Sequence, residues 1–226
     1  MSAVITRDPP IPKPSALRSL DAFREWMHTA APERGRFWFV RGKFEADMSP
    51  EKISVHNFVK AALYTTLGQY VQQRDLGEVF PDGAFLVNES ADLATEPDMM
   101  FCSWECLTEE RIQIRAWRTE ADGDVELHGA PDMVVEIVSD SSVRKDNVEL
   151  RRSYFEAGIP EYWLIDALDD DEIRFQLLVR GADEYVAQPA DAKGYFLSPC
   201  FGRKFLLTRK AHKISGWSYR LLSRAE

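Results

Sequence analysis

A glutamate lies inside an apolar segment near the middle of the chain. Glu136 follows Met133-Val134-Val135 and precedes Ile137-Val138. A run this apolar is typical of a strand that is buried on both faces of a sheet. An ionised carboxylate is stable in such a place only beside a cation, a hydrogen-bond donor or a metal ion. The segment therefore predicts a buried charged site on an internal strand.

A second carboxylate, Asp98, begins another apolar segment about one antiparallel hairpin upstream. If the two segments pair, Asp98 and Glu136 come close enough to share a hard divalent ion, with the Ile137 carbonyl as a third ligand. Asp132 is on the same strand as Glu136, but about 13 Å of extended chain separates them. Such an ion activates water and stabilises the charge that builds on phosphorus, so phosphodiester hydrolysis is the chemistry we expect. In the alternative interpretation, Glu136 pairs with an arginine such as Arg151, and Asp98 only starts a strand after a proline.

Length and composition indicate one domain. The chain has 226 residues and 45% hydrophobic content, enough for one sizeable core over residues 16–226. Residues 1–15 contain four prolines and no long apolar stretch, so we expect a disordered arm rather than a signal sequence. The three cysteines have neither two-pair metal spacing nor an even number, which favours a reduced, cytoplasmic protein. We expect no membrane span.

The formal net charge of −9 argues against a surface that binds nucleic acid everywhere by charge alone. A local basic patch remains compatible with it. Lysines and arginines gather at residues 144–152 and again at residues 203–213. Both groups can also be ordinary solvated faces, and we favour that interpretation for the second one.

In the first half of the chain, the patterns predict two helices and several short strands. A helix follows the cap Ser19, and Arg41-Gly42 joins a hairpin of residues 36–40 and 43–47. A long amphipathic helix extends from Pro50 to about Arg74. Strands are expected at residues 84–87 and 97–103, and a hairpin at residues 112–117 and 125–127.

The second half predicts a strand, a helix and a strand, at residues 131–138, 146–157 and 161–166. This order implies a right-handed crossover between parallel neighbours. Residues 173–179, 185–187 and 195–197 are predicted as edge strands, and residues 209–222 as a closing helix. The fold class is therefore α/β, with a central mixed β-sheet flanked by helices.

Several motifs occur in a fixed order along the chain: Met48-Ser49-Pro50, His56, Pro97-Asp98, residues 131–139, Asp146, Tyr154 and residues 157–166. Taken together, they resemble the Uma-type family of restriction endonucleases, a bacterial branch of the PD-(D/E)xK nuclease superfamily. The resemblance covers about residues 37–207. Its most specific part is Gly-Ile-Pro-Glu-Tyr-Trp at residues 158–163.

The resemblance implies a restriction-endonuclease-like fold and DNA cleavage that depends on Mg²⁺, with Mn²⁺ as an alternative. Asp98 takes the place of the metal-binding aspartate, and Glu136 that of the second ligand. Glu45 and His56 match positions near the site, where Glu45 could hold a metal-bound water and His56 could touch a phosphate or relay a proton. For His56, a helix cap or a partly buried polar contact is the alternative.

The chain departs from the family pattern at the active-site lysine. The superfamily lysine would fall at Val138, and the position at which Uma-type relatives carry a lysine is Leu150. A cation beside the scissile phosphate contributes a few kcal/mol of transition-state stabilisation, about 3 by comparable mutagenesis. Lys145, Arg151 or Arg152 could replace it, although neighbouring helix positions differ by about 100° around the axis. Otherwise these residues are solvent-facing charges, with Lys145 and Glu149 as an ordinary four-apart pair.

Three functions follow from these observations. The first is a metal-dependent DNA endonuclease. The second is a catalytically silent protein of the same fold that acts as a nucleic-acid-binding or assembly module, as Leu150 and the acidic net charge suggest. The third is a hydrolase using Cys102 or Cys106 with His56, which no spacing recommends. The oligomeric state stays open: enzymes that cut both strands often pair two sites, and the apolar segment 173–179 could support a homodimer.

Overall fold

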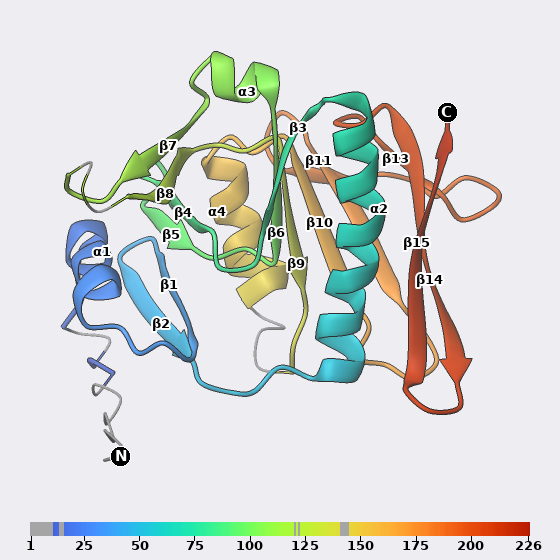
Figure 1. The fold of residues 1–226 in the computed structure, drawn as a ribbon, viewed down its shortest axis with the longest axis horizontal. Coiled ribbons are helices and arrows are strands. Elements are labelled where there is room, and N and C mark those ends of the chain that lie inside the picture. The colour runs from blue at the N-terminus through green and yellow to red at the C-terminus, as the bar shows by residue number, and fades with distance from the viewer. Residues whose placement is uncertain (1–10, 14–15, 120, 122, 141–144) are drawn as a thin grey trace.

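The strand that carries Glu136 lies inside a six-stranded sheet, as its apolar sequence predicts. The structure, a computed structural model, describes residues 11–13, 16–119, 121, 123–140 and 145–226. The sheet has the order β12-β11-β10-β9-β6-β3, in which only β9 and β10 are parallel (Figure 1). Its strands are β3 (Gly77–Pro81), β6 (Met99–Ser103), β9 (Met133–Ile137), β10 (Glu161–Asp166), β11 (Arg174–Arg180) and β12 (Tyr185–Ala187).

A second mixed sheet of six strands contains the predicted N-terminal hairpin. Its order is β2-β1-β5-β4-β8-β7, with β4 and β8 parallel. The hairpin turns at Arg41 and Gly42, whose φ angles of 53° and 76° are those of a tight primed turn. The strands are β1 (Arg36–Val40), β2 (Lys43–Asp47), β4 (Phe85–Asn88), β5 (Leu93–Thr95), β7 (Ile112–Ala116) and β8 (Asp124–Gly129).

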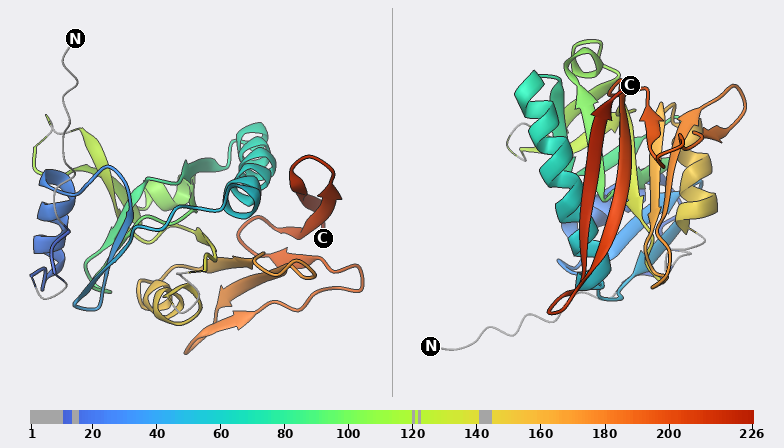
Figure 2. Two further views of the ribbon diagram at one scale, coloured as in Figure 1. Left: turned by 90° about the horizontal axis from the view of Figure 1, so that it is seen from below. Right: turned by 90° about the vertical axis from the view of Figure 1, so that its right-hand side faces the viewer.

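The helices separate and cover these sheets (Figure 2). α1 covers the outer face of the β1-containing sheet, α4 packs between the two large sheets, and α2 covers the far face of the β9-containing sheet. Short π-helical turns, η1 and η3, lead into α2 and α4. The bounds are α1 (Leu20–Thr29), η1 (Ile53–Asn57), α2 (Phe58–Arg74), α3 (Trp104–Thr108), η3 (Lys145–Leu150) and α4 (Arg151–Glu156). The mixed α/β architecture is confirmed.

β9 and β10 are buried on both faces. On β10, Tyr162 and Leu164 pack into the core between the large sheets, while Trp163 and Ile165 pack beneath α2. On β9, Val134 joins the first core and Val135 the second. Since side chains alternate along a strand, Glu136 points to the same face as Val134, toward α4. The parallel pairing of β9 with β10 confirms the predicted crossover.

The predicted helix over residues 209–222 is wrong. The chain forms a hairpin there, in a three-stranded sheet of order β13-β14-β15 with bounds β13 (Phe196–Ser198), β14 (Arg203–His212) and β15 (Gly216–Ala225). Burial has a period of two, because Tyr219 and Leu221 are buried whereas Arg220 and Leu222 are exposed. Gly216 has a φ of 76°, which a turn tolerates and a helix does not.

One edge prediction is also wrong. β11 lies between β10 and β12 instead of at an edge, so residues 173–179 offer no free strand for a partner. None of the described helices combines the length and the apolar character needed to cross a bilayer. The predicted arm 1–15, apart from residues 11–13, and Arg144 of the first basic group lie outside the described residues.

Candidate functional site

Strand pairing brings Asp98 and Glu136 to the same place. β6 runs antiparallel to β9 with Met99 opposite Val135, so Asp98, one residue before β6, reaches the end of β9. Asp98 Oδ2 accepts a hydrogen bond of 2.6 Å from the Ile137 N–H. Asp98, Glu136 and Ile137 line one small cavity together with Lys145. The three residues predicted as metal ligands therefore meet in space.

Glu136 is almost completely buried, and the Tyr154 hydroxyl donates a 2.5 Å hydrogen bond to its Oε1. Burial raises the pKa of Glu136 well above its usual value, and the nearby Asp146 and Asp98 carboxylates raise it further, whereas Lys145 and the Tyr154 hydrogen bond oppose this rise. The local positive charge is thus insufficient to keep every acid of the cavity ionised. An additional cation would relieve this excess of acids.

Lys145 supplies one cation to the cavity. Its Nζ lies 3.2 Å from Asp146 Oδ1 and 4.5 Å from the centre of the Trp38 ring. Burial alone would lower the pKa of Lys145, but attraction to Glu136, Asp146 and Asp98 outweighs burial and raises it. Lys145 is therefore a largely buried ammonium, with its side chain 12% exposed, that stays charged and faces the carboxylates.

Lys60 is a second cation, which the sequence reasoning missed. On α2, Lys60 Nζ lies 3.0 Å from Asp98 Oδ1, 3.0 Å from Glu51 Oε1 and 2.7 Å from Asp82 Oδ2. Burial of its side chain lowers the pKa of Lys60, but Asp98 and Asp82 outweigh burial and raise it. The signal was present in the sequence: Lys60 is four residues after His56, so both side chains share one face of the helix.

His56 binds the carbonyl that was predicted as the third ligand. His56 Nε2 donates a 2.8 Å hydrogen bond to the Ile137 oxygen and lies 3.5 Å from Asp98 Oδ2. On the other side of the ring, Nδ1 lies 3.1 Å from Glu51 Oε2. Glu51, His56 and Asp98 each offer a ligand atom, and these atoms lie within 4.8 Å of one another, so this triad could also hold a metal ion.

Replacing Glu51 by glutamine should make unfolding depend less on pH. Close contact with the His56 imidazole and with the Lys60 ammonium lowers the pKa of Glu51 to about 2 despite its burial. A depressed pKa stabilises the fold above the unfolded-state value, and this contribution disappears as the pH falls toward 2. We expect Glu51→Gln to cost about 1 kcal/mol at pH 7 and less at pH 3, measured by urea unfolding. A constant difference at both pH values would contradict this account.

The other predicted residues lie at the margin or elsewhere. Glu45 lies directly opposite Trp38 on the first hairpin, and Trp38 lines the cavity, but Glu45 itself is not among the lining residues. Arg151 is not brought to the site, because its guanidinium donates a 2.8 Å hydrogen bond to the Tyr185 carbonyl. Leu150, at the family's lysine position, is fully buried in the core beside α4.

Glu96 also lines the cavity, and its role was missed as well. Burial, with a smaller contribution from Asp82, raises the pKa of Glu96 to about 7. As donors, the oxygens of Asp98, Glu136 and Ile137 suit a hard ion such as Mg²⁺. Three acidic side chains, Glu96, Asp98 and Glu136, line the cavity beside two cations, Arg36 and Lys145, so the residues present fit a further cation.

Two comparisons with known proteins gave a match. The model of a family described as "Uma2: Putative restriction endonuclease" matches residues 20–208. The crystal structure of a "putative nuclease" of the DUF820 family from Anabaena variabilis superimposes with a TM-score of 0.56. The two chains are 19% identical, and the alignment covers 81% of this chain and 90% of the other. No curated protein matches.

The structural likeness shows that the fold is restriction-endonuclease-like, as the sequence motifs imply. The family match supports a nuclease function in general terms. Because this match extends over most of the chain, the protein belongs to the Uma2 family of putative restriction endonucleases.

Proposed function

We propose that the protein is a metal-dependent endonuclease that hydrolyses phosphodiester bonds of DNA. The observation that carries the proposal is the convergence of Asp98 and Glu136, from neighbouring strands, on a cavity that also contains the Lys145 ammonium. Two buried carboxylates and a buried cation at the end of a central strand are costly to a fold unless they have a role.

In this proposal, Asp98, Glu136 and the Ile137 carbonyl hold Mg²⁺ or Mn²⁺. When bound, the ion would polarise the phosphodiester and lower the pKa of an attacking water. His56 already donates to the Ile137 carbonyl, so a ligand at that oxygen requires the imidazole to shift or to share it. An imidazole that has shifted could donate its Nε2–H to a phosphate oxygen or pass that proton on.

Lys145 would replace the missing family lysine. Its Nζ is fixed by Asp146 and by the Trp38 ring on the wall of the cavity, where negative charge would develop during hydrolysis. A preorganised cation at that point stabilises the transition state without rearranging. The cation has therefore moved from the family position Leu150 to the first residue of η3.

Supercoiled plasmid incubated with Mg²⁺, with Mn²⁺ or with EDTA tests the proposal. We expect nicking only with a divalent ion, and none by Glu136→Ala. Thermal unfolding of the variant must show that it folds, since an alanine beneath Tyr154 leaves a hydroxyl without its partner. Nicking that persists in EDTA or in Glu136→Ala would reject the proposed centre.

A specific observation favours the second candidate, a silent nucleic-acid-binding module. Neither family position carries a lysine, and Lys60 already neutralises Asp98 at 3.0 Å. This candidate would be supported over the enzyme if the plasmid stays intact with both Mg²⁺ and Mn²⁺ while the protein binds DNA measurably.

A further inference from the structure

The C-terminal hairpin carries a charge opposite to that of the whole chain. Residues 203–225 contain seven lysines or arginines and no aspartate or glutamate, in a protein with a formal net charge of −9. Positive charge concentrated in one element of an acidic protein is the electrostatic pattern of a surface for a polyanion. How strongly this hairpin could attract a polyanion depends on which of its cations form no ion pair with a carboxylate.

Some of these cations are already neutralised. Lys204 and Arg224 both form ion pairs with Asp191. Arg209 donates hydrogen bonds of 2.7 Å to the backbone carbonyls of Asp169 and Asp170, in the acidic segment Asp169-Asp170-Asp171-Glu172. By contrast, Lys210, Lys213 and Arg220 are exposed. In the part of the chain that the structure describes, they form no ion pair with a carboxylate.

Strand register places two of the free cations on one face. Leu207 pairs with Leu221, and both side chains face the core beneath α2. The intervening pairs, Thr208 with Arg220 and Lys210 with Ser218, must therefore face outward. The outer face thus presents arginine, lysine and hydroxyl groups side by side, and these are the side chains that bind phosphate oxygens.

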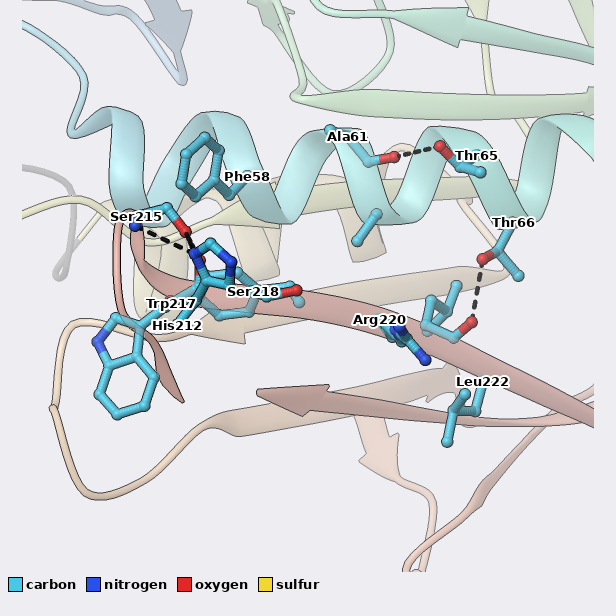
Figure 3. Close-up of a pocket in the computed structure, with 13 residues that line it drawn as sticks. Phe58, Ala61, Thr65, Thr66, His212, Ser215, Trp217, Ser218, Arg220 and Leu222 are labelled. Atoms are coloured by element: carbon cyan, nitrogen blue, oxygen red, sulfur yellow. Dashed lines mark hydrogen bonds between the residues drawn. The ribbon is translucent and has the colours of Figure 1, made fainter. Parts of the chain in front are cut away.

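A groove runs along this hairpin (Figure 3). It lies between α2 and β15 and has a volume of about 550 Å³. Thr65 and Thr66 come from the helix, whereas Ser218 and Arg220 come from the strand. No aspartate or glutamate lines it among the described residues, and residues 58–74 of α2 contain none. Among the described residues, the charged side chain that lines the groove is that of Arg220, which is basic.

His212, at one end of the groove, adds a donor without needing a charge. Its Nδ1 accepts a hydrogen bond of 3.2 Å from the Ser215 N–H, so in the neutral ring the proton is on Nε2. Phe58 lines the same groove, and it follows His56 by only two residues. The groove therefore adjoins the turn of chain that carries a residue of the candidate nuclease centre.

We propose that the groove and the outer face of the β14–β15 hairpin bind the phosphate backbone of duplex DNA beside the cleaved bond. This inference rests on the proposed nuclease function and adds the surface that holds the substrate. Lys210 and Arg220 contact phosphates, the Ser218 hydroxyl donates to a phosphate oxygen, and none of these side chains reads bases. Binding is consequently independent of sequence and strongly dependent on salt.

Binding of a labelled DNA duplex, measured by fluorescence polarisation in EDTA at several salt concentrations, tests the surface without requiring cleavage. For the double variant Lys210→Gln with Arg220→Gln, we expect weaker binding. The slope of log affinity against log salt should fall by about 2, about 1 for each phosphate that the protein no longer neutralises. Both residues are exposed, so the fold should be unaffected, and circular dichroism checks this. Arg34→Gln with Lys193→Gln removes the same charge from exposed positions outside the groove.

Unchanged affinity and slope in the first variant, or an equal loss in the control pair, would overturn the surface. So would tighter binding of duplex RNA than of DNA. The nuclease proposal fails separately: a wild-type protein that binds DNA through Lys210 and Arg220 but nicks no plasmid keeps the surface and loses the enzyme.

Discussion

Asp98→Asn should abolish the heat of magnesium binding in a calorimetric titration. The asparagine oxygen can still accept the hydrogen bond from the Ile137 N–H, so the junction of β6 and β9 is preserved. The variant removes the negative charge that a hard cation requires, together with the oxygen that faces Lys60. Outer-shell partners alone typically change metal affinity by about 10–100-fold, so losing a direct ligand should weaken binding by at least about 100-fold.

Asp82→Asn is the matched control for this titration. Asp82 contacts the same Lys60 ammonium, at 2.7 Å, but does not line the cavity. The Asp82→Asn variant should therefore bind magnesium as tightly as the wild-type protein does. Equal heats for wild type and Asp98→Asn would mean that the ion, if one binds, is held elsewhere.

Lys145→Met should reduce metal-dependent nicking by about 10²–10³-fold, the usual cost of removing one preorganised electrostatic group. It should also move the pH profile upward. Glu136 must lose its proton to hold a cation, and burial already raises its pKa, while Lys145 lowers it. Without the ammonium, the pKa of Glu136 rises further, so activity should begin at a higher pH. Nicking of plasmid across a pH series measures both effects.

Two further variants of the same region serve as controls for Lys145→Met. Lys145→Arg keeps a positive charge and should retain part of the activity with the original pH profile. Arg152→Met removes an exposed cation of α4 that pairs with Glu156 at 3.0 Å, and should change neither. If Arg152→Met lost as much activity as Lys145→Met, the cation would belong to α4 instead.

The sequence was sufficient wherever a local signal determines the structure. Gly42 marked the first hairpin because glycine readily adopts a positive φ, although arginine is not the best residue for the first turn position. The apolar runs around Glu136 and Trp163 marked β9 and β10, and the helix between them required a parallel crossover. Asp98 could be paired with Glu136 because only a neighbouring strand brings another carboxylate to a buried one.

The sequence was insufficient where contacts between segments far apart in the chain determine the structure. Glu51 and Asp82 flank α2 in the chain, and only the folded structure brings both to Lys60. Two strands were missed: β5 has only three residues, and β3 begins at Gly77 and ends at Pro81, residues that are typical of turns. Residues 209–222 have apolar side chains at spacings that suit either a helix or a strand, and their packing on α2 selects the strand.

The position of the C-terminal hairpin limits which truncations the protein can tolerate. Phe205, Leu207 and Tyr219 cover the aromatic layer around Trp163, and the rings of Trp163 and Phe205 are 5.1 Å apart. Deleting the last two strands would expose that layer to solvent, so a shortened protein would aggregate, whatever its catalytic groups. Charge substitutions on the outward face are for this reason the appropriate tools, and a purification tag belongs at the other terminus.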